Sequence, residues 1–107
     1  MYKIRTSIDD IDRARFLARA IVETHSAVSI HIKEIENIYA WEGKVSHIVE
    51  YELTGLCLDP QKVLDVVKDY SYYQMPELII EEVKVYPEIE KWCNDWCNIP
   101  LKNKKGT

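Results

Sequence analysis

The stretch Asn37–Val45 (NIYAWEGKV) decides the fold of this chain. Apolar and polar residues alternate before it, over residues 26–33, and again after it, over residues 45–53, with the period of two that is typical of β-strands. The two runs meet at a Glu-Gly pair, in which Gly43 can take the positive φ of a tight turn. We therefore predict a β-hairpin, with a bulge at residues 33–35, where the alternation shifts.

The predicted hairpin is long, with roughly 13 residues in each arm against about 5–6 in a common strand. Its far half would extend beyond a single small domain. Tyr39 and Trp41, near the tip, are large aromatic side chains, and their exposure to water would leave much apolar surface uncovered. We expect the tip to pack on a second copy of the chain.

The composition fits one globular domain of a reducing cytoplasm. Of the 107 residues, 47% are hydrophobic and 30% are charged, which is enough for a single core. The net charge of −4 argues against sequence-independent binding of nucleic acid. No apolar run approaches the ~18 residues of a membrane span, the first residues do not resemble a signal peptide, and three cysteines do not suit a secreted disulfide framework.

The elements outside the hairpin have clear start signals. Residues 2–6 alternate as a first strand, and residues 7–10 (SIDD) have the form of a capping box that begins a helix. Asp59-Pro60 predicts the start of a second helix, with Asp at the N-cap and Pro at the first helical position. We expect a fourth strand within residues 78–85 and a last helix from Pro87.

The resulting order, β-α-β-β-α-β followed by an extra C-terminal helix, is that of the ferredoxin-like α+β fold, an antiparallel sheet with helices on one face. We expect one domain over residues 1–97 and a flexible tail over residues 98–107, which carries a proline and three lysines. The other face of the sheet is left without cover, which again favours self-association.

Three segments resemble the CutA family of small trimeric proteins that are named for divalent-cation tolerance. They are Ile38–Val45 (IYAWEGKV) at the hairpin tip, Met75–Ile79 (MPELI) at the fourth strand and, less diagnostic, Asp12–Glu23 (DRARFLARAIVE). The resemblance covers residues 2–97. It implies a non-enzymatic homotrimer whose hairpins wrap neighbouring subunits, as in the PII signalling proteins, and a role in the response to divalent metal cations, copper in particular.

Three positions depart from the family pattern. Family members commonly carry a Cys where this chain has Val28, a His where it has Ser71, and a Lys where it has Leu56. Cys and His are the obvious soft and borderline metal ligands of that pattern. Any metal ligands of this chain must therefore be other residues.

The first residues to test as ligands for copper or zinc are His31, His47, Cys93 and Cys97. The cysteines lie one helical turn apart, and the histidines lie on opposite arms of the hairpin. Two ligands do not make a zinc site by themselves. Core packing is the favoured interpretation of the cysteines, because Cys93 shares a helical stripe with Trp92 and Trp96. A surface or subunit contact is the favoured interpretation of the histidines.

Aromatic residues gather in the hairpin tip and before Pro76, two segments that belong to neighbouring subunits in this fold. An interface between subunits is the favoured interpretation, and a small-ligand pocket between chains, with Glu77 as a polar group, is the alternative. The residues assigned to this interface or cleft are Tyr39, Trp41, Glu42, Lys44, Tyr72, Tyr73, Pro76 and Glu77.

No motif of an enzyme is present. The serines lack a G-x-S-x-G context, and no glycine-rich phosphate-binding loop occurs. Two alternatives to a role in metal tolerance stay open. One is a PII-like sensor that binds a small metabolite or anion between subunits, and the other is a trimeric adaptor for a protein partner.

Overall fold

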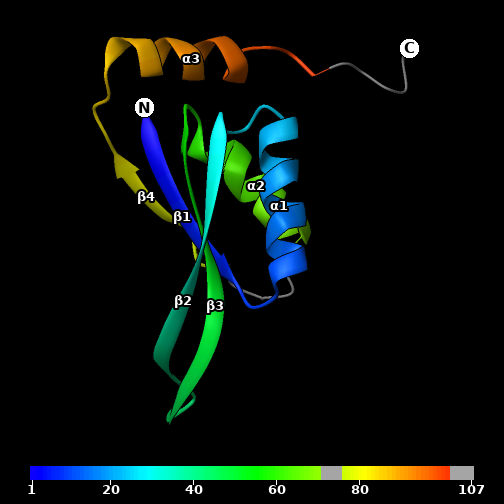
Figure 1. Ribbon diagram of the computed structural model, residues 1–107, viewed down its shortest axis with the longest axis vertical. Helices are drawn as coiled ribbons and strands as arrows, with labels where there is room; N and C mark the ends of the chain where they lie inside the picture. The colour runs from blue at the N-terminus through cyan, green and yellow to red at the C-terminus, as the bar shows by residue number, and fades with distance from the viewer. Residues whose placement is uncertain (71–75, 102–107) are drawn as a thin grey trace.

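The computed structural model describes residues 1–70 and 76–101. Its elements, in chain order, are β1 (Tyr2–Ile8), α1 (Ile11–Glu23), β2 (Ser29–Trp41), β3 (Lys44–Cys57), α2 (Pro60–Tyr70), β4 (Ile79–Glu82) and α3 (Pro87–Cys97). Figure 1 shows α1 and α2 together beside the sheet, while α3 lies across the end of the sheet opposite the hairpin tip. This arrangement confirms the ferredoxin-like α+β fold with an extra C-terminal helix.

The four strands form one antiparallel sheet in the order β2-β3-β1-β4. The β2–β3 register is continuous from Ser29 opposite Leu56 to Trp41 opposite Lys44. The predicted bulge at residues 33–35 is therefore wrong. The apolar position shifts there because this part of β2 is exposed, so no core requires one face to stay apolar.

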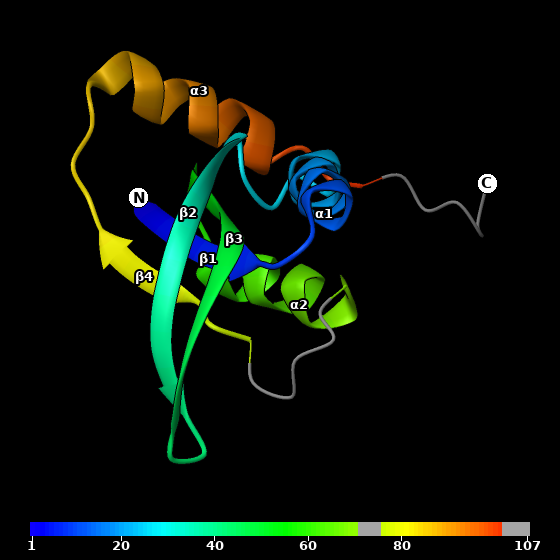
Figure 2. The ribbon, with the colours of Figure 1, turned by 60° about the horizontal axis from the view of Figure 1, so that its bottom comes forward.

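The hairpin has the predicted length and turn. Its arms contain 13 and 14 residues. Glu42 and Gly43 form the two-residue loop, and both have positive φ, 49° and 78°, as a type I′ turn requires. The strand β1 pairs with β3 only as far as Tyr51, so the half of the hairpin nearer the tip extends away from the rest of the sheet (Figure 2).

The main core lies between the sheet and the helices α1 and α2. Its largest fully buried side chains include Ile4 from β1, Ile21 from α1, Leu53 from β3, and Val63 and Val67 from α2. All buried positions taken together recur every two residues in β1 and near the end of β3, and every three or four residues in α1 and α2. This explains why the periodicity of the sequence predicts these elements correctly.

Two local predictions about α1 and α2 have different outcomes. The capping box at residues 7–10 is wrong, because Ser7 lies inside β1 and Asp10 is the N-cap, accepting a hydrogen bond from the Arg13 amide at 3.0 Å. The N-cap of α2 is confirmed, because an Asp59 carboxylate oxygen accepts a hydrogen bond from the Gln61 amide at 3.0 Å.

Helix α3 is attached to the end of α1 through Trp96. The Trp96 indole N–H donates to the Val22 carbonyl at 3.0 Å, and the His25 ring stacks on the indole with ring centres 4.0 Å apart. The His25 Nδ1 atom also lies 2.9 Å from the Trp96 carbonyl oxygen. These contacts fix α3 over the end of the sheet.

Candidate functional site

The three cysteines converge beneath α3. Cys93 and Cys97 face inward from one side of this helix, with their Sγ atoms 3.9 Å apart, and they pack with Val28. Cys57, at the end of β3, is also fully buried, and all three thiols are free. Trp92, which we placed on the same buried stripe, is 49% exposed instead, because a narrower face of α3 contacts the sheet.

Burial keeps these thiols protonated. It raises the pKa of Cys57 to about 12 and that of Cys93 to about 12, and in each case a charge on the neighbouring Cys97 would raise it further. Burial also raises the pKa of Cys97. Since the thiolate is the nucleophile and the metal ligand, these cysteines are inert at neutral pH unless a metal displaces their protons.

The structure separates the two histidines within one chain. His31 lies opposite Thr54, whereas His47 lies opposite Ile38. The seven positions between residues 31 and 38 correspond to about 23 Å along β2. His47 is engaged by Glu36, with Nε2 and Oε1 2.9 Å apart. Within residues 1–70 and 76–101, no group of three or more His, Cys, Asp or Glu residues is arranged to hold a metal ion.

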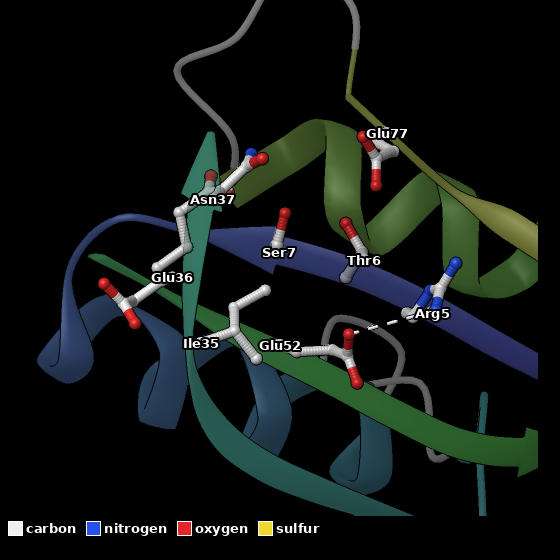
Figure 3. Close-up of a pocket in the computed structure, with 9 residues that line it drawn as sticks. Arg5, Thr6, Ser7, Ile35, Glu36, Asn37, Glu52 and Glu77 are labelled. Atoms are coloured by element: carbon white, nitrogen blue, oxygen red, sulfur yellow. Dashed lines mark hydrogen bonds and ion pairs between the residues drawn. The ribbon is translucent and has the colours of Figure 1, made fainter. Parts of the chain in front are cut away.

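Apart from the cysteines and histidines, a second candidate site lies where the hairpin leaves the rest of the sheet, and its lining is polar (Figure 3). It is a cavity of about 140 Å³, which we call the acidic hollow. Its charged lining residues are Arg5 from β1, Glu36 from β2, Glu50 and Glu52 from β3, and Glu77, which precedes β4.

Glu50 is the most buried carboxylate of the acidic hollow, with 7% of its surface exposed. One carboxylate oxygen accepts a hydrogen bond from the Asn37 side-chain amide at 2.6 Å. Arg5 lies 4.0 Å from a carboxylate oxygen of Glu52, which is the outer limit of an ion pair. The hollow therefore has an excess of negative charge.

The predicted interface residues fall into two places. Tyr39, Trp41, Glu42 and Lys44 lie at the hairpin tip, and Glu77 lines the acidic hollow. Tyr72 and Tyr73 lie outside the described residues. The sequence analysis missed Arg5, Asn37, Glu50 and Glu52 as parts of one site, because the registers of β1 and of β2 against β3 bring them together.

Comparisons with known proteins place the chain in a family. The sequence model described as CutA1 divalent ion tolerance protein matches residues 3–96. No curated protein matches the sequence. Within the described part of the chain, no helix is long and apolar enough to cross a membrane.

Several solved CutA structures have the same fold. CutA1 from Pyrococcus horikoshii is 19% identical, with a TM-score of 0.84, over 95% of this chain and 100% of that one. The periplasmic divalent cation tolerance protein CutA from Archaeoglobus fulgidus is 21% identical, with a TM-score of 0.84, over 92% and 100%. The divalent cation tolerance protein from Thermus thermophilus is 25% identical, with a TM-score of 0.80, over 86% and 94%. The chain belongs to the CutA1 divalent ion tolerance protein family.

Proposed function

We propose that this protein is a non-enzymatic, cytoplasmic homotrimer that acts in divalent-cation tolerance by binding copper. Family membership over residues 3–96 supports the general role. The observation that carries the choice of metal and ligands is the pair of buried thiols of Cys93 and Cys97, 3.9 Å apart.

The exposed hairpin supports the trimer. In the single chain, Ile38, Trp41 and Val45 are 68%, 60% and 77% exposed. A soluble protein rarely leaves such a cluster of large apolar residues in water unless another surface covers it. A hairpin that reaches from one subunit to a different surface of the next makes a head-to-tail contact, and three such contacts can close into a ring.

The spacing of the thiols suits a shared metal. Two sulfur atoms that bind one metal at about 2.3 Å lie about 3.8–4.6 Å apart, from tetrahedral to linear geometry. Thiolate ligands select copper in its reduced, monovalent form, whereas structural zinc takes four ligands. The pair of Cys93 and Cys97 therefore favours copper, with Cys57 as the nearest further thiol. His31 and His47 would have to approach this site from another subunit.

Copper titration of the purified protein tests this proposal. We expect about one monovalent copper ion per chain, lost in the double variant Cys93→Ala with Cys97→Ala and retained in the matched variant His31→Ala with His47→Ala. Circular dichroism would show that both variants stay folded. Equal copper affinity in the cysteine variant and the original protein would overturn the assignment of these ligands.

A further inference from the structure

We propose that the acidic hollow is the receptor for the Lys44 side chain of a second copy of this chain, so that each hairpin tip fills the hollow of the next subunit. This inference rests on the proposed trimer. It adds the contact that fixes the position of each hairpin tip on the neighbouring subunit. The hollow of one chain is incomplete until a partner supplies the ammonium group.

The charge balance of the hollow favours a cation. Glu50 is almost fully buried, and its one hydrogen bond comes from the neutral amide of Asn37. Within the described residues, no Lys, Arg or His forms an ion pair with Glu50, and the guanidinium group of Arg5 is directed to Glu52. Buried carboxylates in folded proteins are paired with a cation, because desolvation of an unpaired charge is costly.

Thr6 gives an independent indication that the hollow suits a polar group. Its side chain is 2% exposed and lines the hollow, yet its hydroxyl has no hydrogen-bond partner in the described part of the chain. Figure 3 shows this side chain between those of Ser7 and Glu77. The hydroxyl oxygen is open to the hollow and not fully enclosed by the chain. Hydroxyl groups in such surroundings are normally hydrogen-bonded, so a group that enters the hollow beside Thr6 should be polar.

A lysine ammonium group fits this chemistry. It has three N–H donors and no acceptor, and the hollow offers carboxylate oxygens from Glu50 and Glu77 together with the hydroxyl of Thr6. A metal ion fits less well, because no group of three or more potential ligands among the described residues has the required arrangement.

Lys44 is the best candidate for this lysine, because the apolar side chains around it are exposed in the single chain and would be buried by a partner subunit. It lies beside the exposed Val45 and opposite the exposed Trp41 at the hairpin tip. It cannot reach the hollow of its own chain, because residues 44 and 50 lie about 20 Å apart along an extended strand. When the hairpin tip docks on a second copy of the chain, Trp41 would become buried. The Lys44 ammonium group would at the same time neutralise Glu50 of that copy.

A double-mutant cycle on the assembled protein tests the contact. Lys44→Met removes the ammonium group, and Glu50→Gln removes the buried charge while its side-chain oxygen can still accept from Asn37. We expect each variant to raise the concentration at which the trimer dissociates by at least about thirtyfold. The double variant should be no weaker than the worse single variant. Lys68→Met, on the exposed surface of α2, is the matched control and should have no effect.

Sedimentation over a dilution series measures these effects. It also distinguishes a failure of the Lys44 contact from a failure of the proposed trimer. If the original protein is trimeric and Lys44→Met dissociates no more readily than Lys68→Met, the contact is wrong while the trimer stands, and a small molecule with an ammonium group becomes the better occupant. Independent, multiplying effects of Lys44→Met and Glu50→Gln would also overturn the contact. If the original protein is monomeric at all concentrations, the proposed trimer fails, and this inference fails with it.

Discussion

The pH dependence of copper affinity gives a quantitative test of the thiol pair. Burial raises the pKa of Cys93 to about 12 and also raises that of Cys97 above the ordinary 9.0. Both groups are therefore protonated in the free protein from pH 6 to pH 8. A copper ion bound by both sulfurs must displace two protons, so the dissociation constant should fall about hundredfold for each unit of pH increase.

This slope can be measured by competition with a chromophoric copper(I) chelator whose own protonation is known, under a reducing agent without thiols. Cys93→Ala leaves one thiol of the pair and should reduce the slope to about tenfold per pH unit, with much weaker binding. A slope near zero in the original protein would show that neutral ligands, such as histidine or methionine, hold the copper. In that case, the buried thiols would be packing groups only.

Three further predictions concern stability and assembly. Gly55→Ala should lower the free energy of unfolding by about 3 kcal/mol or more, because its Cβ would lie 2.1 Å from the Ser29 carbonyl oxygen. Gly43→Ala, at φ +78° with no atom near the added Cβ, should lower the free energy of unfolding by only about 1–2 kcal/mol. Urea unfolding would contradict this order if Gly43→Ala were the less stable of the two variants. Trp41→Ala should weaken trimer assembly by about 2–4 kcal/mol in sedimentation, whereas an unchanged trimer would show that the tip is not buried there. Stability should fall as pH rises from 9 towards 12, because the Cys57 thiol, with its pKa raised to about 12, stays protonated in the native state and ionises first in the unfolded state. Cys57→Val should make this fall shallower, and an identical alkaline profile would show that Cys57 is not the cause.

The features that depend on local chemistry were predictable from the sequence. The period-two runs and the Glu-Gly pair predict the hairpin and its turn, and Asp59-Pro60 predicts the start of α2. One of the errors arises where two local signals compete. At the start of α1, Ser7 and Asp10 both suit an N-cap, and the pairing of Ser7 with Glu52 across the sheet decides between them.

The candidate site was less predictable, because long-range register assembles it. Glu50 and Glu77 are 27 positions apart in the sequence, and no periodicity indicates that both line one cavity with Arg5. The placement of α3 likewise brings Cys57 close to Cys97, although helical spacing alone reveals only the pair of Cys93 and Cys97. Both the acidic hollow and the group of three cysteines can be recognised only when the contacts between helices and strands are known.

The native mass of the protein, purified without chelators or metal-affinity resin, tests the central claim most directly. Because each chain has a mass of 12.6 kDa, a trimer closed by head-to-tail hairpin contacts has a mass of about 38 kDa. We predict this mass at micromolar concentration and below. A particle of the mass of one chain under the same conditions would contradict the account, because the exposed hairpin would then have no partner to cover it.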